Sequence, residues 1–273
     1  MALTPFQRTL CRLLAEHRIR SGESYVAGGV ALNELRGGAR VSRDIDLFHD
    51  TEAAVEASWG EDRTRLEEAG YTVRALRERP GFVEAEIARG GETVRMEWVR
   101  DSAYRFFPLV EHPELGLALH PFDLATNKLL ALIGRREVRD WIDVLHCDSS
   151  LQPVGYLAWA ACGKDPVFSP ASILEHAART GRFVPEEVAE LSFAGAPPET
   201  SELAHRWRQA LEAARAVVEL LPGERAGTCV LSADSELSRL APDDLGPALR
   251  REEIRFRTGS IRGVLPTLHL QGG

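Results

Sequence analysis

The stretch of residues 25–48 constrains this chain most, because its second half reads as a strand with two acids on one face. That strand carries the sequence Asp44-Ile45-Asp46-Leu47. Successive side chains of a strand point to opposite faces, so Asp44 and Asp46 project from the same face, roughly 7 Å apart along the strand. Two carboxylates beside apolar neighbours repel each other in a partly dry site, and a bound divalent cation offsets that repulsion most simply. The pattern therefore predicts a metal-binding strand.

A glycine pair precedes these acids, where a short strand at Tyr25–Ala27 gives way to a helix beginning near Val30. Gly28 and Gly29 have no Cβ, so their backbone can come close to a ligand. The N-terminus of a helix offers unpaired N–H groups to an anion. A phosphate site on one element beside a metal pair on the next predicts a site for a nucleoside triphosphate and Mg²⁺, in which the metal bridges phosphate oxygens.

Together these residues resemble the signature of the nucleotidyltransferase superfamily, and specifically its AbiEii/AbiGii toxin-like branch. The resemblance covers about residues 20–150, and the ordered set is more specific than any one motif. It rests on Gly28-Gly29, on Arg40, Ser42, Asp44, Ile45, Asp46 and Leu47, on Glu97 within VRMEWV, on Lys128 within ATNKLLAL, and on Arg139, Asp140 and Asp143 within VRDWIDVL. Many members have Ser after the first glycine, so a side-chain hydroxyl for phosphate is missing at Gly29.

The resemblance implies an α/β (α+β) fold, with a nucleotidyltransferase-type mixed sheet flanked by helices. It also implies metal-dependent transfer of a nucleoside monophosphate from an NTP to an acceptor hydroxyl, with release of pyrophosphate. The implied ligands of Mg²⁺ or Mn²⁺ are Asp44, Asp46 and Glu97. The implied nucleotide-binding residues are Gly28, Gly29, Arg40, Ser42, Arg43 and Lys128, and the implied catalytic set is Asp44, Asp46, Glu97, Lys128, Asp140 and Asp143.

The resemblance implies partners as well. Proteins of the AbiEii-like branch look like toxins of two-gene systems, and relatives modify tRNA ends and block translation. We therefore expect an NTP as one substrate, an RNA end (tRNA included) or a protein as the acceptor, and a cognate antitoxin. The residues themselves mark no acceptor, and scattered arginines such as Arg206 and Arg208 are the only sign of a tRNA-binding surface.

The third carboxylate has two competing assignments. In the strand-like run TVRMEWV, residues 93–99, Glu97 alternates with Met96 and Trp98 and so lies on the face opposite to them. Glu84 and Glu86 alternate in the same way on the preceding run. Periodicity cannot choose between these acids, whereas the resemblance favours Glu97.

Lys128 is unusual because only two of the 33 basic residues, Lys128 and Lys164, are lysine. An ammonium within an apolar helix suits a phosphate, since it is a compact point charge. The alternative is a lysine whose stem packs in the core while its head group reaches solvent.

The remaining charged candidates also have two interpretations each. Asp140 and Asp143 share one face of a predicted helix, where they either orient Lys128 or form a solvated face that pairs with Arg136 or Arg139. Arg40 and Arg43 in the same way either bind triphosphate or balance the neighbouring acids.

Periodicity and turn residues predict the order of elements along the chain. Helices are expected after Thr4-Pro5, over Glu52–Ala69, from a cap at Asp123 to a stop at Gly134, and over Glu137–His146. Strands are expected over residues 71–76, 81–88 and 93–99, with a hairpin turn at 89–91, and over Leu115–His120. Later helices are expected from Ser169-Pro170 to Gly181, at Pro185, and over Ser201–Leu221, and the tail has strand-like pieces at residues 228–233, 253–259 and 261–268 without an assigned place.

Length and composition bound the rest. The 273 residues, 44% of them hydrophobic, suffice for one large domain or two modest ones. We predict a nucleotidyltransferase-like catalytic domain over residues 1–150 and a mainly helical region of unknown role over residues 151–273. No apolar run approaches the roughly 18 to 20 residues that cross a bilayer, and the N-terminus lacks the layout of a signal peptide, so we expect a cytoplasmic protein without a membrane partner.

Net charge and cysteine spacing exclude some classes of protein. The formal net charge of −8 argues against a surface that coats nucleic acid generally. Cys11, Cys147, Cys162 and Cys229 have neither CxxC spacing nor paired histidines, so neither a zinc site nor a disulfide framework is indicated.

Two other functions stay open from the sequence. The chain could be a non-catalytic relative that senses nucleotides or binds a partner, although its acidic set is complete. It could also be a glycosyltransferase that uses Asp44-Ile45-Asp46 for a sugar nucleotide, although the early position of the motif and the glycine pair before it disfavour this class.

Overall fold

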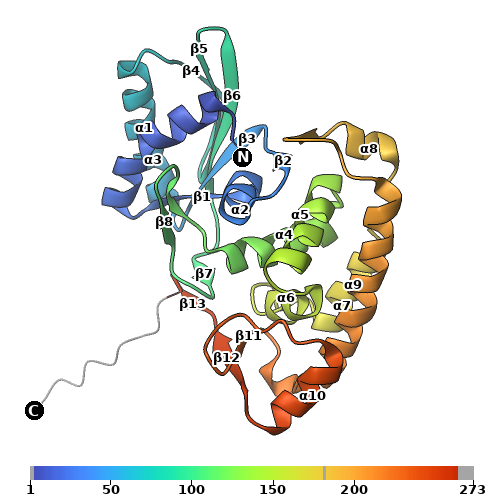
Figure 1. The fold of residues 1–273 in the computed structure, drawn as a ribbon. Coiled ribbons are helices and arrows are strands. Elements are labelled where there is room, and N and C mark those ends of the chain that lie inside the picture. Colours follow the sequence, from blue (N-terminus) through green and yellow to red (C-terminus); the bar gives the residue numbers. More distant parts are fainter. Residues whose placement is uncertain (1–2, 181–182, 264–273) are drawn as a thin grey trace, which may run out of the picture.

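The core of the structure is a seven-stranded mixed sheet with the strand order β4-β5-β6-β3-β1-β9-β8 (Figure 1). The computed structural model describes residues 3–180 and 183–263. The strands are β1 (Ser24–Ala27), β3 (Asp44–His49), β4 (Thr72–Arg79), β5 (Phe82–Arg89), β6 (Glu92–Arg100), β8 (Val110–His112) and β9 (Gly116–Ala118). β3 is parallel to β6 and β1 to β9, whereas the other neighbouring pairs are antiparallel. The predicted mixed sheet flanked by helices is confirmed.

Helices lie on both faces of this sheet (Figure 1). They are α1 (Pro5–Ser21), α2 (Gly28–Arg36), α3 (Glu52–Glu68) and α4 (Pro121–Arg135). α3 packs on one face, where the indole N–H of Trp98 on β6 donates to Asp62 of α3 at 2.9 Å and the Trp98 ring meets Trp59 edge-on. α2 packs against β1 and β3, and α4 packs against α2. Side chains that alternate with Trp98 therefore face away from α3.

Strand alternation decides which side chains enter the core. On β3, Ile45 and Leu47 are completely buried, whereas Asp44 and Asp46 are half-buried on the opposite face. β6 repeats this pattern, since Trp98 is completely buried and Glu97 is not. The acids therefore share the face that looks away from α3.

Three predicted helix ends are wrong. α2 begins at Gly28 instead of near Val30, so both glycines belong to its first turn. α4 is capped by the imidazole of His120 and not by Asp123, whose carboxylate instead accepts backbone N–H groups of the segment before the helix. The helix also continues through Gly134 and ends at Arg136, which adopts the left-handed conformation with φ 57°.

The region after residue 150 is mainly helical, as expected, and it also supplies short strands. Its helices follow α5 (Val138–Ser150) and are α6 (Val154–Ala161), α7 (Pro170–Ala178), α8 (Pro185–Ala189), α9 (Thr200–Leu220) and α10 (Pro242–Arg250), with a 3₁₀ turn at Gly223–Arg225. β11 (Thr228–Ser232) pairs with β12 (Ile254–Thr258), β10 (Ser192–Phe193) pairs with β2 (Arg40–Val41), and β13 (Ser260–Ile261) pairs with β7 (Tyr104–Arg105). The predicted stop at Gly181 and the last part of the 261–268 run lie outside the described residues.

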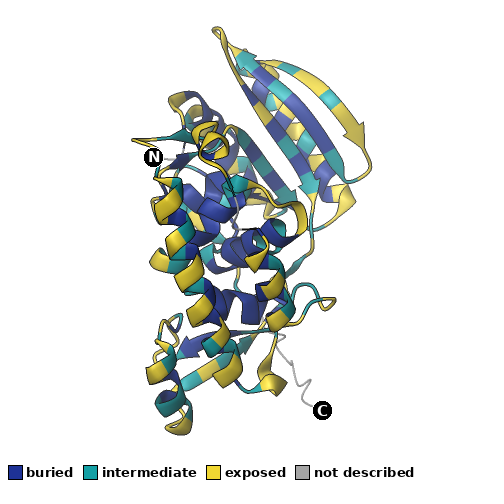
Figure 2. Ribbon diagram, turned by 90° about the vertical axis from the view of Figure 1, so that its right-hand side faces the viewer, coloured by how far each residue is buried: buried dark blue, intermediate teal, exposed yellow. Residues whose placement is uncertain are grey.

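Buried residues run from the sheet into the later helices (Figure 2). One hydrophobic cluster includes Leu10 of α1, Trp98 of β6 and Trp207 of α9. A smaller cluster around Tyr156 and Trp159 holds α6, α9 and β11 together. The boundary proposed at residue 150 stays a prediction. Within residues 3–180 and 183–263, no helix has the length and apolarity needed to cross a membrane.

Candidate active site

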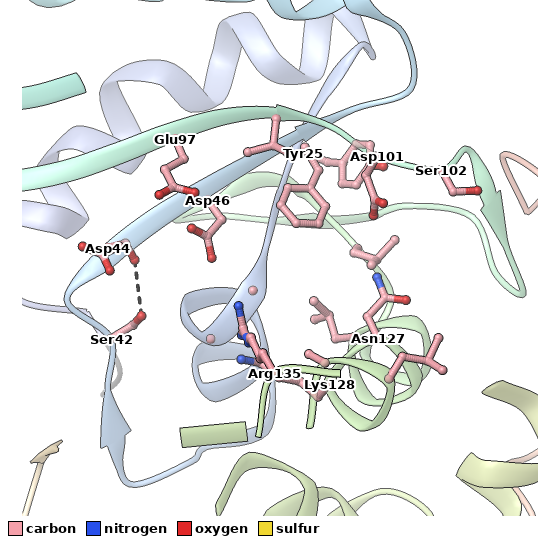
Figure 3. Close-up of a pocket in the computed structure, with 18 of the residues that line it drawn as sticks. Tyr25, Ser42, Asp44, Asp46, Glu97, Asp101, Ser102, Asn127, Lys128 and Arg135 are labelled. Atoms are coloured by element: carbon pink, nitrogen blue, oxygen red, sulfur yellow. Dashed lines mark hydrogen bonds between the residues drawn. The ribbon is translucent and has the colours of Figure 1, made fainter. Parts of the chain in front are cut away.

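A cavity of about 710 Å³ lies between α2, α4 and the face of the sheet that looks away from α3. Its wall brings together most of the predicted site residues, although they come from four separate parts of the sequence (Figure 3). The predicted residues in this wall are Gly28, Gly29, Arg40, Ser42, Asp44, Asp46, Glu97 and Lys128. Arg43, Asp140 and Asp143 are outside it.

The three predicted metal ligands stand on two neighbouring strands. Asp46 on β3 is the register partner of Glu97 on β6, and Asp44 lies two residues earlier on β3. Within the described part of the chain, no hydrogen bond or ion pair engages the carboxylate of Asp44, Asp46 or Glu97. The backbone carbonyl of Asp44 accepts from the hydroxyl of Ser42 at 3.3 Å, which leaves the Asp44 carboxylate free of this contact.

Asp46 and Glu97 are destabilised in their charged form. Burial raises the pKa of Asp46, and the negative charge of Asp44 raises it further, whereas Lys128 opposes both effects. Burial also raises the pKa of Glu97, and the charge of Asp46 adds to this shift. A cation placed between the strands would reverse these shifts, since an opposite charge favours ionised carboxylates.

The donor chemistry of this face fits a hard divalent cation. Carboxylate oxygens are the ligands that Mg²⁺ takes in proteins, and one or two of them suffice when substrate phosphates supply the others. Among the described residues, no three His, Cys, Asp or Glu side chains are gathered closely enough to hold a metal by themselves. The fit is therefore to a metal that takes its remaining ligands from a bound phosphate.

The glycine pair lies directly against the acids. Gly28 has φ +65°, and a Cβ at this position would overlap the carboxylate of Asp46. A Cβ at Gly29 would overlap the guanidinium of Arg40. The first turn of α2 carries backbone N–H groups without partners in the helix, and these are suited to bind an anion. A side chain at Gly28 would therefore fill the space between that turn and Asp46.

Lys128 is held from behind by two buried acids on α5. Its ammonium lies 2.9 Å from Asp140 and 3.1 Å from Asp143, and the lysine side chain is 7% exposed. Since an ammonium has three N–H donors, two point to α5 and one is left for the cavity. Asp140 and Asp143 therefore position Lys128 and do not themselves line the cavity. The alternative of a solvated acidic face is excluded by their burial.

Arg40 belongs to the same buried network. Its Nε and Nη2 donate to the two carboxylate oxygens of Asp143 at 2.9 and 2.7 Å, and Asn33 donates to the same carboxylate at 3.1 Å. Burial alone would raise the pKa of Asp143, but Lys128 and Arg40 outweigh it and lower that pKa to about 2. Arg40 thus reaches the cavity wall with its charge already neutralised.

Arg43 and the competing acids lie elsewhere. The guanidinium of Arg43 donates to the backbone carbonyl of Glu190 at 2.9 Å and does not reach the cavity wall. Glu84 is buried and pairs with Arg95 at 2.9 Å, and Glu86 pairs with Arg74. Of the three acids weighed for the third position, Glu97 is the one in the cavity wall.

The cavity wall also contains residues that were not predicted from the sequence. Asp101 follows Glu97 and Val99 at the spacing of one strand face, which was a usable signal. Asn127 directly precedes Lys128 on α4, and Lys164 enters the wall from the turn after α6. Arginine side chains close the remaining sides, namely Arg79, Arg135 and Arg139.

Comparisons with known proteins concern the fold. No model of a known protein family and no curated protein matches this sequence. In three dimensions the chain resembles JHP933 from Helicobacter pylori, with a TM-score of 0.53 and 14% identity over 77% of this chain and 91% of that chain. It also resembles MenT4, a nucleotidyltransferase toxin from Mycobacterium tuberculosis, with a TM-score of 0.53 and 16% identity over 79% of this chain and 83% of that chain. The chain thus shares the fold of a nucleotidyltransferase, and the AbiEii branch stays a prediction.

Proposed function

We propose that this protein is a Mg²⁺- or Mn²⁺-dependent nucleotidyltransferase, which moves a nucleoside monophosphate from an NTP to an acceptor hydroxyl. The observation that carries the proposal is the set of three unpartnered carboxylates, Asp44, Asp46 and Glu97, beside a helix N-terminus in one cavity. Acids without protein partners suit a site that cations complete, and free N–H groups suit phosphate. The fold shared with MenT4 supports the same class of reaction.

The acidic residues and the phosphate-binding residues have separate roles in this proposal. Asp44 and Asp46 would hold the metal ions, and Glu97 would complete their shell. When bound, the metal supplies positive charge that activates the attacking oxygen and steadies the leaving pyrophosphate. The first turn of α2 at Gly28 and Gly29 binds phosphate oxygens, and the remaining N–H of Lys128 stabilises the charge that develops on them.

The bond changes follow from this placement. The acceptor oxygen forms a bond to the α-phosphorus while the bond from that phosphorus to the β-phosphate oxygen breaks. Glu97 takes the proton of the acceptor hydroxyl as the general base. Pyrophosphate leaves toward α2 and Lys128.

The acceptor and the biological role extend the proposal. We assign the acceptor to an RNA end, tRNA included, or to a protein hydroxyl, and the role to the toxin of an AbiE-like toxin-antitoxin pair in the cytoplasm. The toxin role is supported by the fold shared with MenT4, and the AbiE-like branch by the ordered motif residues.

The test is a transfer assay with labelled nucleotides. Purified protein is incubated with Mg²⁺ and each of the four NTPs, labelled at the α-phosphate, against total cellular RNA and protein. Asp46→Asn and a sample with a metal chelator are run alongside. Label in an RNA or protein band, seen only with the parent and metal, would establish the reaction and the class of acceptor.

Two other results of these measurements would favour the alternative functions. NTP binding without label in any band would favour the non-catalytic, nucleotide-sensing alternative. Stabilisation by a sugar nucleotide in preference to every NTP would favour a glycosyltransferase and would contradict the proposal.

A further inference from the structure

The cavity extends well past the three carboxylates. Asp101 lies four residues beyond Glu97 along the line of β6, which corresponds to about 13 Å, and the even spacing keeps it on the same face. Asp101, Ser102 and Asn127 form this far end (Figure 3). Because the phosphate-binding groups are at the near end, the far end is where the nucleoside of a bound NTP would reach.

Lys164 fixes the side chain of Asn127 at this end. The ammonium of Lys164 donates to Oδ1 of Asn127 at 2.8 Å and to the backbone carbonyl of Asp123 at 3.1 Å, and it pairs with the Asp123 carboxylate at 2.8 Å. These three partners account for all three of its donors. Lys164 therefore has no N–H left for a ligand, and it acts on the cavity only through Asn127.

The contact determines which way the amide of Asn127 faces. An ammonium can only donate, so it must meet the oxygen of the amide, and the NH₂ group is left on the other side. That NH₂ group has no hydrogen-bond partner among the described residues. Figure 3 shows Asn127 and Asp101 on the same end of the cavity, with the amide nitrogen on the side toward Asp101. The end thus presents a fixed donor and a carboxylate acceptor.

The surrounding wall suits a flat, apolar ring. Phe48 and Tyr104 line the cavity and are partly exposed, whereas Tyr25, Leu119 and Leu124 are buried in its wall. Figure 3 shows the ring of Tyr25 beside Asp101. Aromatic and aliphatic surfaces stack on a nucleobase, whereas a ribose has little apolar face to offer.

We propose that this far end is the nucleobase subsite, in which Asn127 donates to the edge of the base and Asp101 accepts from it. Lys164 is a positioning residue that holds the amide of Asn127 in the donating orientation. This inference rests on the proposed function, because it assumes that an NTP occupies the cavity. It assigns the choice among NTPs to residues that are separate from the metal and phosphate groups.

Asn127→Asp provides a nearly isosteric test. The new carboxylate keeps an acceptor for Lys164, so the buried ammonium stays paired, but the group toward the base changes from a donor to an acceptor. Asp101→Asn makes the converse change on the other side. Dissociation constants are measured with Mg²⁺ for the four NTPs and their deoxy forms, each with a non-hydrolysable bridge between the α- and β-phosphates. Inorganic tripolyphosphate is the control for the phosphate end.

The inference predicts a changed order of preference. The NTP that the parent binds best should lose about tenfold relative to the others in Asn127→Asp, as expected for a lost hydrogen bond to a buried group. Binding of tripolyphosphate should stay unchanged. A uniform loss for all four NTPs, a change only in the ratio of ribo to deoxy forms, or a parent without any preference would overturn the base subsite. A parent that binds neither NTP nor tripolyphosphate would overturn the proposed function, and this inference with it.

Discussion

Two sets of carboxylates lie near Lys128 and differ in their partners. Asp44 and Asp46 face the cavity, and none of the described residues forms a hydrogen bond or ion pair with their carboxylates. Asp140 and Asp143 are buried behind it and are bound by Lys128, Arg40 and neighbouring donors. The pKa of Asp46 is consequently raised, and that of Asp143 is lowered to about 2.

This contrast indicates that the paired acids contribute to the stability of the fold and that the unpaired acids do not. A buried acid with cationic partners stabilises the fold at neutral pH, whereas a buried acid without them costs stability. In the proposed function, metal ions bind the unpaired set, and the paired set holds Lys128 in place for the phosphates.

Removal of one unpaired acid should give the largest effect. In Asp46→Asn we expect nucleotidyl transfer to fall on the order of 1,000-fold, since charge stabilisation by a bound metal supplies several kcal/mol. The melting temperature should stay at or above that of the parent, because a buried charge that repels Asp44 is removed. Turnover and thermal unfolding of the same preparation measure both. Turnover at the parent's level would remove the metal role of Asp46.

The same change in the paired set should act on stability. Asp143→Asn leaves the buried charge of Arg40 without its counterion and leaves Lys128 with Asp140 alone, and breaking such a buried pair costs on the order of 3 kcal/mol. Urea unfolding at neutral pH measures this loss. If Asp143→Asn unfolds like the parent while Asp46→Asn is destabilised, the assignment of the two sets is reversed.

Much of this arrangement followed from the sequence because it depends on local patterns. Alternation on β3 and β6 placed Asp44, Asp46 and Glu97 on the face opposite to the core, and the structure agrees. The glycine pair at the start of a helix could be predicted for the same reason. These features involve neighbours in sequence, where periodicity and backbone freedom decide the outcome.

Other parts depend on contacts that no local pattern encodes. Arg40 meets Asp143 across 103 residues, and the sequence alone cannot distinguish an arginine that meets a phosphate from one that meets a buried acid. α6 is buried on all sides, so its sequence has no amphipathic periodicity. α10 could not be predicted because Gly246 and Pro247, which disfavour helices, lie inside it. The helix stop at Arg136 was missed because a non-glycine residue adopts the left-handed conformation there.

The pH dependence of the free energy of unfolding should have opposite signs for Asp143 and Asp46. Asp143 has a folded-state pKa of about 2 against an ordinary value of 3.8, so its contribution of about 2 kcal/mol is complete above the ordinary value and is lost as the pH falls toward 2. Asp46 has a raised pKa, so it lowers the free energy of unfolding as the pH rises above 3.8.

Urea unfolding of the parent and Asp46→Asn in steps from acid to neutral pH tests this sign. We expect the parent to lose stability below its plateau as Asp143 is protonated, and the advantage of Asp46→Asn over the parent to grow with rising pH. An advantage that is constant with pH would mean that the Asp46 carboxylate is not perturbed by its surroundings.

The two ends of α2 offer the finest comparison, because Gly28 and Gly37 share the left-handed conformation at φ +65° and +67° but differ in what lies nearby. A Cβ at Gly37 would meet nothing within 4 Å, whereas one at Gly28 would overlap the carboxylate of Asp46. Alanine at either position should cost about 1 kcal/mol of stability for the strained backbone. Only Gly28→Ala should also abolish binding of Mg²⁺ and NTP, since it displaces Asp46 and fills the phosphate site. Calorimetric titration of both variants decides the matter: equal NTP affinity would mean that the close approach of this backbone to Asp46 is not part of the binding site.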